Sequence, residues 1–135
     1  MRTLFWMSGL CVILGLSACQ SSTPNRIEKV HHYTAKQKCP TLLVMKVGEI
    51  LQFNAPENPS TGYAWQLVQP LKLFKTEETF LQPETDKPVL GMGGEKSFSF
   101  RAEQPGQELI ELVHVRSWES NKEPTEQWLC RIRVS

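Results

Sequence analysis

Beyond residue 40, hydrophobic and polar residues alternate in short runs and do not recur every three or four positions. Residues 96–102 (KSFSFRA) place Phe98 and Phe100 on one face. In residues 126–134 (EQWLCRIRV), one face carries Trp128, Cys130, Ile132 and Val134, and the other carries Arg131 and Arg133. A period of two is typical of a β-strand that buries one face.

Further β-rich runs are separated by Pro, Gly and Asn residues. They cover residues 41–46 (TLLVMK), 49–55 (EILQFNA), 63–68 (YAWQLV), 71–74, 79–81 and 107–115 (QELIELVHV). About one hundred residues suffice for a single hydrophobic core. The pattern therefore predicts an all-β fold, an immunoglobulin-like β-sandwich of about seven or eight strands.

The N-terminus has a different pattern. An uncharged, largely apolar run at residues 4–16 (LFWMSGLCVILGL) follows Arg2. The run is too short for a permanent membrane span and is typical of a signal-peptide core. It ends in LSAC at residues 16–19, which resembles the lipobox of bacterial lipoproteins.

In lipoproteins the signal peptide is cut before the cysteine, which then carries the lipid, so the resemblance implies acylation of Cys19. Gln20 follows, where an Asp would suggest retention at the inner membrane, so we expect a lipid anchor in the outer membrane of the cell envelope. The alternative is an ordinary secretory signal with an incidental cysteine.

Residues 20–38 (QSSTPNRIEKVHHYTAKQK) are polar and contain few large apolar side chains. Such a segment cannot bury enough surface to fold by itself. We therefore expect a signal peptide at 1–18, lipidated Cys19 with a polar tether at 19–38, and one domain at 39–135.

The charge balance narrows the choice of partners. The chain has 15 basic and 14 acidic residues, and loss of Arg2 with the signal peptide would make the numbers equal. A neutral chain argues against nucleic acid as a partner and against electrostatic docking on anionic lipid. We expect membrane attachment through the lipid alone, a monomer, and no metal or other cofactor.

Two of the four cysteines remain once Cys11 leaves with the signal peptide and Cys19 is acylated. Cys39 and Cys130 would then lie in an oxidising compartment, where a disulfide is expected. The first and last strands of an immunoglobulin-like sandwich often lie side by side, which would bring the two together. A metal or redox site is the alternative, but no C-x-x-C spacing supports it.

Three candidate loops lie between the predicted strands. In the first (NPSTGY), Pro59 fixes its own φ and restricts Asn58, while Gly62 can adopt positive φ. This predicts a stiff loop with the hydroxyls of Ser60 and Thr61 at its tip and Tyr63 at its end. A plain hairpin turn is the alternative.

The second and third loops suggest close contact with a partner. Gly91, Met92, Gly93 and Gly94 would let a backbone approach closely, although this segment taken alone is better interpreted as a flexible connection. Arg116, Ser117 and Trp118 follow a predicted strand. Arg and Trp are enriched at binding hot spots, but a core tryptophan at a strand end would also explain the third loop.

In this order, the loops resemble those of the chagasin family of cysteine-peptidase inhibitors, whose motifs are NP[ST]TG[FY], GxGG and RPW. NPSTGY and GMGG match fully, RSW has Ser117 for proline, and VGE at residues 47–49 also fits the family pattern. The resemblance covers roughly residues 41–134. It implies an immunoglobulin-like sandwich that presents the loops at one end and inhibits papain-like peptidases reversibly and without covalent chemistry.

By the same resemblance, the loops act as a wedge in the active-site cleft, and the inhibitor has no catalytic residues. NPSTGY would cover the catalytic cysteine, and GMGG would line one side through its backbone. Trp118 would pack on the aromatic wall beside the catalytic histidine, with Arg116 positioning its loop. Ser117 leaves that loop less rigid than proline would.

Three other functions compete with this interpretation. An enzyme would need a nucleophile with its base or a metal cluster, yet His31 and His32 lie in the predicted tether and His114 lies in a half-buried strand. A lipoprotein inhibitor of another enzyme, such as lysozyme, would also be small and disulfide-bearing. A non-inhibitory immunoglobulin-like module is the third, and neither of the last two explains three ordered loops.

Overall fold

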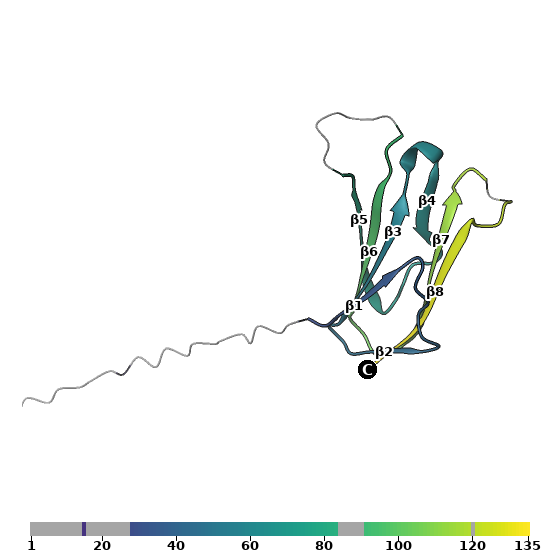
Figure 1. The fold of residues 1–135 in the computed structure, drawn as a ribbon. Coiled ribbons are helices and arrows are strands. Elements are labelled where there is room, and N and C mark those ends of the chain that lie inside the picture. The colour runs from purple at the N-terminus through teal and green to yellow at the C-terminus, as the bar shows by residue number, and fades with distance from the viewer. Residues whose placement is uncertain (1–14, 16–27, 84–90, 120) are drawn as a thin grey trace, which may run out of the picture.

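Two four-stranded sheets pack face to face (Figure 1). Of the 135 residues, the computed structural model describes residues 15, 28–83, 91–119 and 121–135. The elements are β1 (Val30–Thr34), β2 (Leu43–Met45), β3 (Ile50–Glu57), the 3₁₀ turn η1 (Pro59–Thr61), β4 (Tyr63–Leu67), β5 (Phe74–Leu81), β6 (Gly94–Ala102), β7 (Gly106–Arg116) and β8 (Glu126–Val134). One sheet has the order β1-β3-β6-β5 and the other β2-β8-β7-β4, which confirms the predicted all-β sandwich.

The core lies between the sheets, where the predicted alternation places it. Along β8, Trp128, Cys130, Ile132 and Val134 are buried and the residues between them are exposed. Phe53 of β3 packs against Trp65 and Trp128 of the opposite sheet, with ring centroids 5.2 and 4.8 Å apart. Each fully buried side chain of this size contributes about 1.5–3 kcal/mol.

Strand β5 differs from its predicted form. The sequence predicted two short runs at 71–74 and 79–81, but the whole of Phe74–Leu81 is one edge strand paired with β6. Its middle, KTEET, is polar because this edge strand is open to water on both faces: Lys75, Glu77 and Thr79 are exposed on one face and Glu78 on the other. Backbone pairing from Phe74↔Ala102 to Leu81↔Glu95 holds it in the sheet regardless of side-chain polarity.

The predicted tether is wrong over part of its length, because Val30–Thr34 form β1. This strand runs parallel to β3, from Val30↔Ile50 to Thr34↔Asn54. Two side-chain contacts support it: the Glu28 carboxylate pairs with the Arg101 guanidinium, and the Tyr33 ring lies 5.7 Å from Trp128. The folded unit therefore starts before residue 39, while Cys19 and all of the predicted signal peptide except Gly15 lie outside the described residues.

The predicted disulfide between Cys39 and Cys130 is confirmed. It joins the segment before β2 to the buried face of β8, with a Cα–Cα distance of 5.3 Å. As expected for a sandwich, the early strand β2 lies beside the last strand β8, in parallel register from Leu43↔Ile132. The Trp128 indole nitrogen donates to the Gln37 carbonyl at 2.8 Å and adds a second connection nearby.

Candidate functional site

The three predicted loops lie at one end of the sandwich, although they come from both sheets. Loop 1 (residues 58–63) follows β3 and includes η1, loop 2 (residues 91–94) leads into β6, and loop 3 (residues 116–118) follows β7. Figure 1 shows η1 and the end of β7 opposite the end that carries β2 and the C-terminus. Strand register alone brings these loops to one edge.

Loop 1 is organised by the side chain of Asn58. Its Oδ1 accepts hydrogen bonds from the Ser60 amide at 3.1 Å and the Ser60 hydroxyl at 2.7 Å, and so caps η1. Its Nδ2 donates to the Gly91 carbonyl at 2.9 Å. One amide side chain therefore shapes loop 1 and attaches loop 2 to it.

Loop 1 is not a hairpin turn, because it connects β3 in one sheet to β4 in the other. The Thr61 hydroxyl donates to the Asn58 carbonyl at 2.7 Å and accepts from the Tyr63 amide at 3.2 Å. Gly62 has φ of +79° and donates its amide to the Pro59 carbonyl at 3.1 Å. This left-handed conformation is one that β-branched residues strongly resist.

Loop 2 is packed as well as tethered, which argues against a simple flexible connection. A Cβ on Gly94 would lie 2.3 Å from the Leu81 carbonyl oxygen and 2.7 Å from the Phe80 ring. Only glycine fits at this start of β6. Met92 is half-buried and follows the exposed Gly91.

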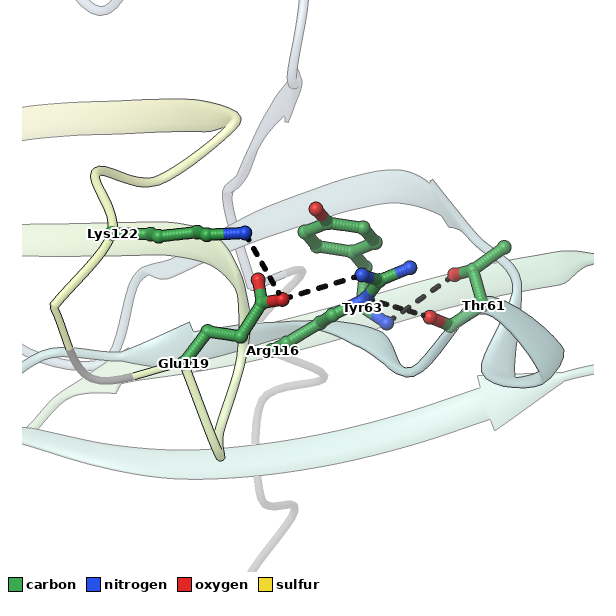
Figure 2. A network of polar contacts seen from close by, with 5 residues as sticks. All are labelled: Thr61, Tyr63, Arg116, Glu119 and Lys122. Carbon is green, nitrogen blue, oxygen red and sulfur yellow. Dashed lines mark hydrogen bonds and ion pairs between the residues drawn. The ribbon is translucent and has the colours of Figure 1, made fainter.

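Loop 3 is joined to loop 1 by Arg116, as Figure 2 shows. Its Nε donates to the Thr61 carbonyl at 2.9 Å. The guanidinium carbon also lies 4.3 Å from the centre of the Tyr63 ring and 5.9 Å from that of Trp118. A cation within about 6 Å of the centre of an aromatic ring is attracted to its face.

Trp118 is the exposed aromatic residue of this edge, with 68% of its surface accessible. Its indole nevertheless rests on loop 1, because a Cβ on Gly62 would lie 2.1 Å from Cη2 of that ring. The core-tryptophan alternative is therefore wrong here: Trp65 and Trp128 are the core tryptophans, at 2% and 3% exposure. Trp118 is held against a neighbour and still presents most of its surface outward.

Two acidic residues of this edge were absent from the predicted site. Glu57, only 8% exposed, accepts a hydrogen bond from the Trp65 amide at 2.6 Å and ties the two ends of loop 1 together. Glu119 lies 3.5 Å from Arg116 and 3.3 Å from Lys122. The three-residue spacing of these opposite charges was the available sequence signal, and no comparable signal marked Glu57.

The contacts of the histidines are those of structural side chains within the strands. His114 stacks on Trp65 with centroids 5.1 Å apart, and its Nδ1 lies 2.9 Å from the Thr125 hydroxyl. His31 lies 3.7 Å from Glu49, whereas His32 is exposed, since successive strand residues point to opposite faces.

Over the described ranges, no His, Cys, Asp or Glu residues form a group of three suited to a metal. No described helix has the length and apolar character needed to cross a membrane.

A family model and two curated proteins match this chain. The model of the chagasin family of peptidase inhibitors, I42, matches residues 44–132. Chagasin of Trypanosoma cruzi is 26% identical over 110 residues, covering 77% of this chain and 98% of chagasin. Amoebiasin-2 of Entamoeba histolytica is 27% identical over 96 residues, covering 70% of this chain and 77% of amoebiasin-2.

The fold has a solved counterpart in the crystal structure of the cysteine protease inhibitor EhICP2 from Entamoeba histolytica. The TM-score is 0.69 at 23% identity, with 81% of this chain and 98% of that chain covered. A β-sandwich with three joined loops at one end is the class that the fold and the site define. The chain belongs to the chagasin family of peptidase inhibitors.

Proposed function

We propose that this protein is a reversible, non-covalent inhibitor of papain-like cysteine peptidases and that it has no catalytic activity of its own. The observation that carries the proposal is that hydrogen bonds join loops 1, 2 and 3 into one edge of the sandwich. Loop 2 is tied to loop 1 through Asn58 and Gly91, and loop 3 is tied to loop 1 through Arg116 and Thr61. The three loops form one preformed surface.

The edge has the properties of a wedge. An association that orders few side chains and loops loses little entropy, so a prearranged surface binds more tightly than a flexible one of equal area. In this arrangement, loop 1 covers the catalytic cysteine. Loop 2 contributes mainly backbone on one side, and Trp118 packs on the aromatic wall beside the catalytic histidine on the other.

Loop 1 also has a shape that resists cleavage. Residues 59–61 form a 3₁₀ turn and not an extended strand. The Asn58 carbonyl accepts from the Thr61 amide and hydroxyl, and the Thr61 carbonyl accepts from Arg116. A peptidase would have to break these bonds before it attacked either carbonyl, which favours inhibition over turnover.

An assay against papain and lysozyme side by side tests the proposal. We expect inhibition of papain that is lost on dilution, no effect on lysozyme, and an intact inhibitor mass after prolonged incubation. Inhibition of lysozyme alone would support the rival function. Progressive cleavage by papain would mean that the chain is a substrate, and hydrolysis by the purified protein itself would mean that it is an enzyme.

We also propose that the protein is anchored to the outer membrane by lipid on Cys19. The support is the LSAC sequence together with the direction of β1. Val30 pairs with Ile50 at the start of β3, while loop 1 begins after Glu57 at the end of β3. At about 3.3 Å per residue the chain therefore enters the sandwich about 20 Å from loop 1. An anchor on this side leaves the wedge facing away from the membrane.

A further inference from the structure

The turn that carries Trp118 is held by a chain of charges. The Glu119 amide donates to the Arg116 carbonyl at 3.0 Å, which closes a four-residue turn with Trp118 at its third position. The Glu119 carboxylate lies between Arg116 Nη1 at 3.5 Å and Lys122 Nζ at 3.3 Å. Figure 2 shows this carboxylate on the side of Arg116 away from Thr61.

Arg116 is the centre of the arrangement. Its Nε donates to the Thr61 carbonyl, its guanidinium carbon lies 4.3 Å from the centre of the Tyr63 ring, and the centre of the Trp118 ring is 5.9 Å away. The guanidinium is planar and its donors keep a fixed geometry, so an acceptor at Nη1 adds a second point that restrains the whole group. Among the described residues, Glu119 is the acidic side chain that pairs with Arg116.

We propose that Glu119 is a positioning residue of the inhibitory edge: it holds the Arg116 fork in place and thereby fixes the orientation of Trp118 against Gly62. The proposal rests on the function proposed above. Glu119 acts through Arg116 and the turn, and its carboxylate makes no contact with the peptidase. Its partial burial makes the pair less screened than a fully exposed one: the Glu119 side chain is 20% exposed and that of Arg116 33%.

A substitution in this turn offers an independent way to restore the orientation of Trp118. Ser117 occupies its second position, where the fixed φ of proline suits type I and type II turns. The preceding residue, Arg116, is in extended conformation at the end of β7, as a residue before proline prefers. Ser117→Pro should therefore stiffen the turn without using any charge.

The experiment uses the purified full chain and its variants in one detergent buffer. Glu119→Gln keeps the size of the side chain and removes the charge, and Glu123→Gln is the matched control from an exposed position in the same connection. Association and dissociation rates with papain are measured for each. The order parameter of the Trp118 indole N–H is measured by ¹⁵N relaxation in the free protein.

We expect Glu119→Gln to raise the dissociation rate about 3- to 10-fold, with an association rate within about twofold of the parent. The Trp118 indole order parameter should fall, and Ser117→Pro added to Glu119→Gln should recover both quantities. Glu123→Gln should change neither. An unchanged indole order parameter in Glu119→Gln, or a double variant that recovers neither quantity, would overturn the proposal.

The two proposals fail in different ways. If the parent does not inhibit papain, the proposed function is wrong, and the relaxation measurement still decides whether Glu119 orders Trp118. If the parent inhibits papain and Glu119→Gln behaves like Glu123→Gln, only the role of Glu119 is wrong.

Discussion

Trp118 combines large solvent exposure with a fixed position. Most exposed aromatic side chains must lose rotamer freedom when they bind, whereas this indole already rests on Gly62 and beside the Arg116 guanidinium. Binding energy at protein interfaces is concentrated in a few such anchors. At the scale of single residues, the proposed inhibition should therefore depend on Trp118 more than on its neighbours.

Trp118→Ala should weaken inhibition of papain by about 2 kcal/mol or more, roughly a thirtyfold rise in the inhibition constant. Leu129→Ala is the matched control, since Leu129 is 47% exposed on β8, away from the loops. Circular dichroism should show unchanged β-structure in both. A folded Trp118→Ala variant that inhibits as well as the parent would mean that the wedge is the wrong model.

Gly62→Val should be comparably harmful for two structural reasons. The native φ of +79° is resisted by a β-branched residue, and the new Cβ would occupy the space of the Trp118 ring. The strain reshapes loop 1, and the clash displaces loop 3. We expect a folded variant whose thermal midpoint falls by about 4–8 °C for each kcal/mol of strain, together with a large loss of inhibition. Retained inhibition would show that neither contact matters for binding.

Single residues of loop 1 could be predicted from the sequence because its glycine and proline impose conformation locally. The partners of those residues could not be predicted, since they depend on tertiary contacts. The bond from Asn58 to Gly91 spans 33 positions, and that from Arg116 to Thr61 spans 55. The role of Glu57 could not be predicted for the same reason. Its carboxylate accepts a hydrogen bond from the Trp65 amide, and this contact forms only because the chain passes from β3 in one sheet to β4 in the other.

At the scale of elements, strands with one buried face were predictable, whereas β1 was missed and the polar middle of β5 was missed. Strand β8 buries alternate residues, so its pattern is present in the sequence. Strand β1 and the middle of β5 are held by backbone pairing with β3 and β6, which leaves little trace in side-chain polarity. Polarity alone therefore made β1 look like a tether.

The attachment of β1 should depend on pH through Glu28. Its hydrogen bond and ion pair with Arg101 lower the pKa of this carboxyl below its ordinary value of 4.5. A lowered pKa in the folded state means that the stabilisation is complete above the ordinary pKa and is lost as the pH falls through the lowered value. The ends of β1 should then loosen in acid while the core remains folded.

NMR signals of the Val30–Thr34 amides, followed from neutral to acidic pH, measure this effect. In the parent they should shift toward disordered values only below about pH 4.5. In Glu28→Gln they should be partly shifted at neutral pH and show less further change. Parent and variant curves that coincide would show that the Glu28–Arg101 pair does not hold β1.

At the scale of the whole molecule, the disulfide lies apart from the three loops that we propose as the binding edge. Cys39 and Cys130 join the N-terminal segment to the middle of β8, whereas loop 3 precedes the start of β8. Replacing both cysteines with alanine should lower the free energy of unfolding by about 4–5 kcal/mol on the chain-entropy model, since 91 positions separate them. The domain that remains folded should inhibit papain as the parent does. Weaker inhibition by a demonstrably folded variant would mean that the disulfide also shapes the edge.

The proposed anchor would orient the domain relative to the membrane. Strand β1 starts beside the beginning of β3, and loop 1 follows the end of β3, so the start of β1 and the three loops lie at opposite ends of the sandwich. A lipid upstream of β1 would hold the protein at the membrane and leave the edge accessible to a peptidase in solution. Membrane-bound protein should therefore inhibit papain about as strongly as protein released from the membrane.

Cys19→Ser tests the anchor itself. Each buried acyl methylene contributes about 0.8 kcal/mol to membrane binding, so loss of the lipid should release the protein completely. The variant should incorporate no fatty-acid analogue and should appear in the soluble fraction, with its inhibition of papain unchanged. Cys11→Ser is the matched control, because this cysteine lies within the apolar run of the expected signal peptide. Labelling that persists in Cys19→Ser would refute the anchor, whereas loss of labelling together with loss of inhibition would mean that the lipid does more than hold the protein at the membrane.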